Sequence, residues 1–149
     1  LAAPGRHGMT YLDRVETLWP LRSQFPVGTQ VPFHCTASGK MYLSSLRSDK
    51  LDRVLRWREL DRKTDHTITT VDGLRAELAQ TRQRGFSVDD EEFMEQMVAI
   101  AAPIKDNTGR LLTTLSIHAP LQRHNVDSLV ELLPALQKAT SRIEELCVE

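Results

Sequence analysis

The chain has 149 residues, of which 40% are hydrophobic and 26% charged, as expected for one globular domain with its own core. Its 19 basic and 20 acidic residues give a net charge of −1, which argues against a dedicated nucleic-acid surface, and no apolar run approaches the ~18 residues of a membrane span. Two cysteines, Cys35 and Cys147, lack the spacing of a zinc site or a disulfide framework, so we expect reduced thiols and a cytoplasmic protein.

The N-terminal region is predicted to contain short strands and loops. Its first residues, LAAPGRHGMTYL, include neither an initiator methionine nor a signal-peptide pattern, so we expect a fragment of a longer protein. A turn at residues 4–8 separates a strand at 1–3 from one at 9–16, where Val15 is among the apolar members. Two prolines and a glycine predict a loop or irregular edge strand at 20–28.

Two helices are predicted next. The first covers residues 37–46 and begins after a cap at Thr36 or Ser38. The second covers residues 48–57, with Ser48 as its expected cap.

A polar segment at 58–70 is expected to cross the surface before a third helix at 71–85. Thr70 or Asp72 would cap that helix, and Gly85 would end it.

The C-terminal half is predicted to be a hairpin followed by a helix. A short strand at 86–92 runs into an acidic turn, and apolar strands at 96–106 and 110–120 flank an Asn-Thr-Gly turn. Pro103 predicts an edge position or a bulge. Residues 125–148 carry a helical apolar stripe that Pro134 should kink or split. The order of elements predicts an α+β domain with an antiparallel sheet and flanking helices.

The stretch HCTASGK at residues 34–40 offers several chemistries. It is not a phosphate-binding P-loop, because His34 stands where the first glycine is needed and Met41 replaces the Ser or Thr that follows the lysine. A nucleophilic Cys35 would need a base, but neighbouring residues of an extended segment point to opposite faces, so His34 would not serve it. A small buried Cys35 is the simpler interpretation, and a thiol enzyme is the alternative from the enzyme class.

The same stretch opens a helix with small residues. The first N–H groups of a helix lack internal partners and carry partial positive charge, so Ala37 and Ser38 could receive a carboxylate. The alternative is that small residues here only let the helix pack closely on the sheet.

The hairpin gives a second line of argument. Ser116 and His118 share one face of their strand, and Met97 and Ala99 share one face of theirs. The Ser-His pair would form the polar floor of a pocket with Met97 and Val31 in its apolar lining. Alternatively, both polar groups are satisfied internally or face water. The four acids at 89–92 would form a solvated turn or, with a nearby histidine, a metal site.

Four motifs, in order and at comparable spacing, resemble a known family. They are PFHCTASGK, GFSVDDEE, AAPIKDNTG and SIHAP, and they fall within a similarity that covers residues 9–148. In these motifs the chain resembles the C-terminal effector-binding domain of IclR-type bacterial transcriptional regulators. The resemblance implies a GAF-like fold, in which a curved antiparallel sheet is flanked by helices.

The resemblance also implies a function and a site. The domain would bind a small-molecule effector, often an organic or aromatic acid, and we expect no catalysis, cofactor or membrane association, with a metal near Asp89 or His118 left open. It would assemble as a dimer or tetramer and would reach DNA only through an N-terminal winged helix-turn-helix domain that this chain lacks. The family's pocket positions correspond here to the following residues: Val31, Ala37, Ser38, Asp89, Met97, Ala99, Ser116 and His118.

Two positions depart from the family pattern. His118 stands where many relatives have a small residue, which suggests a different ligand and a pH-sensitive group. Gln96 replaces a common glycine, so the entry to its strand is expected to differ. An oligomerisation module without any ligand is the third class of function considered.

Overall fold

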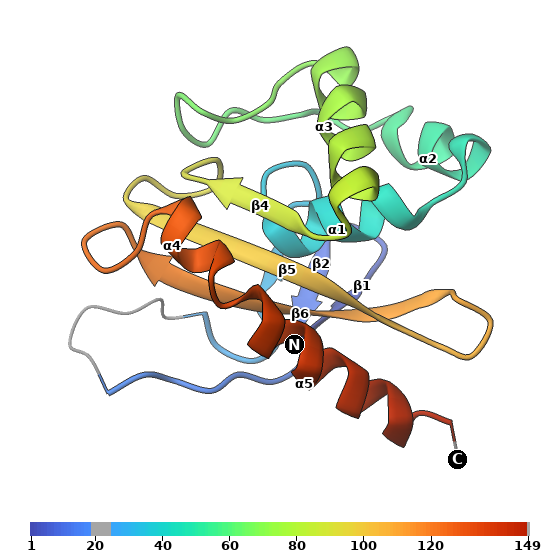
Figure 1. Ribbon diagram of the computed structural model, residues 1–149. Coiled ribbons are helices and arrows are strands. Elements are labelled where there is room, and N and C mark those ends of the chain that lie inside the picture. Colours follow the sequence, from blue (N-terminus) through green and yellow to red (C-terminus); the bar gives the residue numbers. More distant parts are fainter. Residues whose placement is uncertain (19–24, 149) are drawn as a thin grey trace.

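The chain folds around one six-stranded antiparallel sheet (Figure 1). This computed structural model describes residues 1–18 and 25–148. The strand order is β3-β2-β1-β6-β5-β4, and every pair is antiparallel. The strands are β1 (Ala2–Pro4), β2 (Met9–Tyr11), β3 (Gln30–Val31), β4 (Ser87–Asp90), β5 (Met97–Lys105) and β6 (Leu111–Pro120).

Helices cover both faces of the sheet. They are α1 (Ala37–Ser45), α2 (Ser48–Leu55), α3 (Val71–Arg84), α4 (Val126–Val130) and α5 (Leu133–Leu146). Helices α1 to α3 lie on one face and α4 and α5 on the other, as Figure 1 shows. This arrangement confirms the predicted α+β class and its GAF-like sheet.

Alternation along β5 and β6 divides the two faces. Val98, Ile100 and Ala102 point to an apolar cluster that also contains Leu129 of α4 and Leu136 of α5. The intervening residues of β5 face α1, where Ala99 and Ala101 pack with Ala37 and Met41. One pair of strands therefore supplies both an apolar core and the floor beneath α1.

Most helix ends lie where the sequence predicts them. The Thr36 hydroxyl accepts a hydrogen bond from the Gly39 N–H at the start of α1, and Thr70 accepts one from Gly73 at the start of α3. Gly85 ends α3 in the left-handed conformation, at φ 82°. The prediction that Ser48 caps the second helix is wrong, because Ser48 is its first residue and the preceding Arg47 makes no side-chain cap.

The strand predicted at 9–16 is too long. β2 ends at Tyr11, and Val15 is fully exposed. The neighbouring strands explain this, because β1 has three residues and β3 two, so no ladder continues beyond Tyr11. Of the loop predicted at 20–28, residues 20–24 lie outside the described residues, and 25–28 form no strand.

The two proline predictions are confirmed. The last helical region is split into α4 and α5, and Pro134 lies in the first turn of α5. Pro103 lies in β5 beyond Ala101, where the pairing with β4 has ended, and a bulge follows between Ile104 and Lys105.

The polar segment at 58–70 is a loop, but it is not wholly at the surface. Thr64 and Thr67 are buried, and their hydroxyls donate hydrogen bonds to the backbone carbonyls of Glu91 and Glu92. The surface expectation fails because hydroxyl groups can be buried when they satisfy backbone acceptors.

Among residues 1–18 and 25–148, no helix combines the length and the hydropathy that crossing a bilayer requires.

Candidate functional site

Helix α1 lies very close to the segment that precedes it. A β-carbon on Gly39 would approach the Phe33 carbonyl oxygen to 2.3 Å, so only glycine fits there. Thr36 fixes the turn by donating a 2.6 Å hydrogen bond to the Pro32 carbonyl. Close packing therefore explains the glycine of the HCTASGK stretch.

Close packing does not explain Ser38. Its side chain is 1% exposed, and among the described residues its hydroxyl is the one buried side-chain polar atom without a hydrogen-bond partner. An unpaired buried hydroxyl costs about 1–3 kcal/mol. Because Ser38 is in the first turn of α1, this hydroxyl lies beside the helix N–H groups that have no partner within the helix.

A polar row crosses the sheet beneath α1. Asp89 of β4 pairs with Ala99 of β5, which pairs with His118 of β6. Ser116 lies two residues before His118 on the same face, and its hydroxyl is 3.0 Å from the His118 Nε2 atom. Ala37 packs on Ala99, so the start of α1 lies over the middle of this row.

The remaining two predicted residues lie at the margins. Val31 is on the edge strand β3 and belongs to the core around Phe33 and Leu74. Met97 is half-buried at the start of β5. The preceding Gln96 has φ 65°, the left-handed conformation that glycine adopts most easily, so the substitution at this position keeps a glycine-like backbone.

Aromatic rings connect the two ends of the row. Tyr11 stacks on Phe25 with ring centroids 5.7 Å apart, and Phe25 lies 5.9 Å from Phe93 and 6.3 Å from His118. The Tyr11 hydroxyl is also 3.3 Å from the His118 Nε2 atom. Sequence reasoning missed these three rings. Tyr11 carried a usable signal, because its strand was predicted, whereas the loop residues Phe25 and Phe93 carried none.

His118 is not poised to titrate at neutral pH. Burial, with a smaller contribution from the positive charge of the N-terminus, lowers the pKa of His118 to about 4. The ring is therefore neutral at pH 7, and its Nε2 atom lies within reach of two hydroxyls. Titration of His118 near neutral pH is therefore disfavoured, because the surroundings disfavour the imidazolium ion.

The acidic turn is only partly solvated, because Asp90 is exposed whereas Asp89 and Glu92 are buried. Asp89 and Glu92 are 5% and 7% exposed, and the Glu92 N–H donates a 2.8 Å hydrogen bond to the Asp89 carboxylate. Burial, followed by the charge of Glu92, raises the pKa of Asp89 to about 7. Within the described parts of the chain, no group of three or more His, Cys, Asp and Glu side chains is arranged to hold a metal ion.

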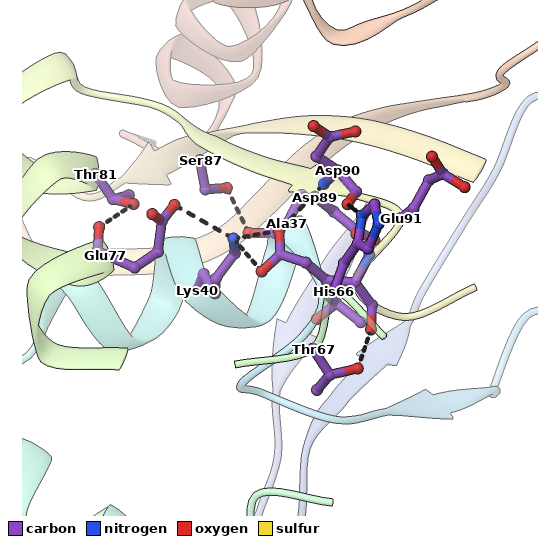
Figure 2. A network of polar contacts seen from close by, with 12 residues as sticks. Ala37, Lys40, His66, Thr67, Glu77, Thr81, Ser87, Asp89, Asp90 and Glu91 are labelled. Carbon is purple, nitrogen blue, oxygen red and sulfur yellow. Dashed lines mark hydrogen bonds and ion pairs between the residues drawn. The ribbon is translucent and has the colours of Figure 1, made fainter. Parts of the chain in front are cut away.

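Lys40 of α1 is buried between carboxylates, with Glu77 to one side of it in Figure 2. It is 1% exposed, its amine donates 2.8 Å hydrogen bonds to both carboxylate oxygens of Glu92, and it lies 3.3 Å from Glu77. Glu77 in turn pairs with Arg84 at 2.9 Å. The lysine of the HCTASGK stretch is therefore committed to internal carboxylates.

Cys35 has the surroundings of an inert thiol. It is fully buried, and burial, with added contributions from the charges of Asp89 and Glu92, raises the pKa of its thiol to about 12. Its neighbour His34 turns away, with Nε2 2.8 Å from the Asp61 carbonyl oxygen. A thiolate at neutral pH is thus disfavoured, which removes the chemical basis of the thiol-enzyme alternative.

A cavity of about 690 Å³ opens at one end of the polar row. Tyr11, Phe25, Ser116 and His118 border it on one side, and residues of α5 such as Leu136 border it on the other. Its volume is in the range of small-molecule sites. Of the eight predicted residues, Ser116 and His118 line this cavity, whereas the other six do not.

The family comparison covers nearly the whole chain. Residues 1–145 match the family model described as Bacterial transcriptional regulator IclR C-terminal. A protein of Cupriavidus necator named probable transcriptional regulator SauR is 41% identical over 135 residues, which are 91% of this chain and 54% of that protein. The chain thus spans about half the length of this relative.

Solved structures show the same fold. The crystal structure of Thermotoga maritima IclR superposes with a TM-score of 0.89 at 28% identity, covering 97% of this chain and 58% of that one. The inducer-binding domain of PobR from Acinetobacter, a double mutant in complex with 3-hydroxybenzoic acid, superposes with a TM-score of 0.88 at 23% identity, covering 97% and 86% of the two chains.

Proposed function

The chain belongs to the IclR family of bacterial transcriptional regulators, whose C-terminal effector-binding domain it matches, and from this premise we propose that it senses a small organic acid through the polar row beneath α1. The family consists of regulators and not of enzymes. The proposal concerns the chemical class of the effector, the residues that hold it, and the consequence of binding.

The unpaired Ser38 hydroxyl is the observation that carries this proposal. A buried polar group without a partner is unfavourable, and a ligand oxygen would remove that cost. The neighbouring N–H groups at the start of α1 favour an anion, as does the helix dipole. A carboxylate therefore suits this position. Its charge would be balanced by the helix N–H groups and not by Lys40, because Lys40 is already paired with Glu92.

The rest of the row suits the remainder of such a ligand. Ser116 and the neutral His118 would hydrogen-bond its polar groups, and Asp89 would accept a hydrogen bond from a ligand hydroxyl group. The apolar wall would come from Ala37 and Ala99, with Val31 and Met97 at its margins. Tyr11 and Phe25 add flat apolar surface, which favours an aromatic acid. The hydroxybenzoate in the PobR complex belongs to this chemical class.

Binding would be reported to the rest of a longer protein. The curated relative is about twice as long as the matched region, and we propose that an N-terminal DNA-binding domain and assembly into dimers or tetramers complete the regulator. The effector would change DNA binding only as far as it prefers one arrangement of these parts.

A thermal-shift panel of short-chain carboxylates and hydroxybenzoates, with the matching amides as controls, tests the proposal. A ligand that binds only the folded state adds about 2.7 kcal/mol of stability at 100 times its Kd. We expect saturable shifts from acids and none from amides.

Variants assign the site. Ser38→Ala and Ser116→Ala should each weaken binding by about 1–2 kcal/mol in titration calorimetry. Ser45→Ala is the matched control, because Ser45 is an exposed serine of α1 whose hydroxyl bonds the Tyr42 carbonyl. Unchanged affinity in both site variants would place the ligand elsewhere. A panel without any thermal shift would favour the alternative of an oligomerisation module without a ligand.

A further inference from the structure

A second concave surface lies away from the effector site. It is a cleft of about 820 Å³ between α2 and the turn that joins β1 to β2. Helix α2 and the residues that flank it, from Arg47 to Arg58, form one side, and the turn contributes Arg6 and His7. None of its lining residues belongs to the polar row, so its occupant is independent of the effector.

The cleft concentrates positive charge. Five basic side chains line it, whereas Asp49 is its one acidic lining residue. The whole chain has a net charge of −1, so these cations are segregated on one surface. Asp49 lies 3.4 Å from Arg47, but both side chains are mostly exposed and such pairs are weak, so Asp49 does not neutralise the cleft.

Two apolar side chains, Val54 and Trp57, are part of the cleft lining. Trp57, just beyond the end of α2, is 89% exposed, and Val54 within α2 is half-buried. Exposed tryptophan beside arginine is the composition of interaction hot spots. The wall is held in place, because the Arg58 guanidinium lies 4.9 Å from the Phe33 ring centroid and donates a hydrogen bond to the Arg6 carbonyl.

We propose that this basic cleft docks an acidic protein segment, with an apolar side chain of the segment on Trp57 and its carboxylates on Arg47, Lys50 and Arg53. The basic side chains supply the charge complementarity, and arginine suits carboxylates because its guanidinium binds both oxygens. The cleft therefore gives this regulatory domain a protein-docking function separate from effector sensing.

An acidic peptide fits better than nucleic acid. A nucleic-acid backbone offers phosphates to the cations but little to an apolar side chain such as Val54. A peptide can place an apolar residue between carboxylates and use both features. The near-neutral net charge of the chain also lacks the general basic excess of nucleic-acid domains.

The test uses a fluorescein-labelled octapeptide of Glu, Asp, Leu and Phe and its counterpart with Gln and Asn in place of the acids. Anisotropy should show saturable binding of the acidic peptide alone, weakened by salt. In a Trp19→Phe background, the remaining tryptophan, Trp57, should change its fluorescence on binding.

Exposed positions permit clean variants. Trp57→Ala and Arg53→Glu should each lower the peptide affinity about tenfold or more. Lys138→Gln, which removes an exposed cation of α5, should not change it. All three variants should keep the thermal shift produced by the effector, so failure of this proposal is distinguishable from failure of the sensor.

Three results would overturn the proposal. One is no peptide binding up to about 1 mM. Another is equal binding by Trp57→Ala, Arg53→Glu and the unaltered chain. The third is tighter binding of a DNA duplex of about 20 base pairs that the same two variants abolish, which would assign the cleft to nucleic acid.

Discussion

The two faces of the hairpin β5–β6 are made from alternate residues of the same strands, yet they differ in kind. Toward α4 and α5, Ile100 and Ile117 pack in an apolar cluster. Toward α1, the same strands present Ala99, Ser116 and His118 beside the buried Asp89. The first face is an apolar core, in which the side chains need only pack closely. The second includes His118, with a shifted pKa, and lies against the start of α1, where the Ser38 hydroxyl is unpaired.

Under the proposed function, this difference separates stability from ligand binding within one sheet. Polar groups that are buried without full partners reduce stability, and such groups are concentrated at binding and catalytic sites. The apolar face stabilises the hairpin and so holds the polar face in position. Changes on the two faces should therefore have different signatures in unfolding and in binding.

The largest effect is expected from the buried charge behind the polar row. Lys40→Met removes the partner of Glu92 and leaves its carboxylate uncompensated, which should cost about 3–5 kcal/mol in the free energy of unfolding. Urea unfolding measures it. The double variant Lys40→Met/Glu92→Gln removes both charges and should recover much of the loss. A cost below about 1 kcal/mol for the single variant would contradict the ion pair.

The apolar face should respond to cavity formation. Ile100→Ala, at a fully buried position, is expected to cost about 2–5 kcal/mol while leaving effector affinity unchanged in the folded protein. Urea unfolding and calorimetry on the same sample give both quantities. If affinity fell together with stability, the two faces would be energetically coupled, and the separation argued above would not hold.

The pH dependence of stability should single out Asp89. Its pKa is raised to about 7 from an ordinary value near 3.8, so the folded state holds a proton that the unfolded state has released between these values. Stability from this group is present below about pH 4 and is lost as pH rises through 7, with a slope of at most about 1.4 kcal/mol per unit. Asp89→Asn should remove that slope.

His118 acts in the opposite sense and has to be separated from Asp89. Its lowered pKa makes stability fall as pH decreases from about 6.5 toward 4, because the unfolded state takes up the proton first. The two slopes oppose each other in that window, so unfolding is best compared between Asp89→Asn and the unaltered chain from pH 5 to 8. Parallel curves would show that Asp89 has no raised pKa.

The smallest effect on stability is expected at Ser38. Ser38→Ala removes an unpaired hydroxyl and should leave stability within about 1 kcal/mol, or raise it slightly, while weakening effector binding. Ser44→Ala is a matched control in the same helix, because its buried hydroxyl donates a 2.7 Å hydrogen bond to the Met41 carbonyl and its loss should cost about 1 kcal/mol. Equal costs at the two serines would mean that Ser38 has a partner.

Predictions that depended on local pattern agree well with the structure. The caps at Thr36 and Thr70, the end of α3 at Gly85 and the split before Pro134 all follow from backbone and side-chain preferences of a few residues. The placement of Ser116 and His118 on one face required only the two-residue period of a strand.

Apart from the cap at Ser48, the predictions that failed depended on distant partners. β2 stops at Tyr11 because β1 and β3 are short, which the alternation of residues 9–16 does not reveal. Glu92 was expected in a solvated turn or a metal site and is buried, because the 58–70 loop and Lys40 cover it. Phe25 and Phe93 lie beside the polar row and were not predicted there, because residues in loops show no hydrophobic periodicity.

The sequence by itself determined the family, the fold class, the order of the elements and the start of α1, because motifs and periodicity are properties of neighbouring residues. Only the tertiary structure decided the protonation of Asp89 and His118, the sequestration of Lys40 and the isolation of the Ser38 hydroxyl. Each of these depends on burial by segments that are distant in the sequence, and that burial exists only once the chain has folded.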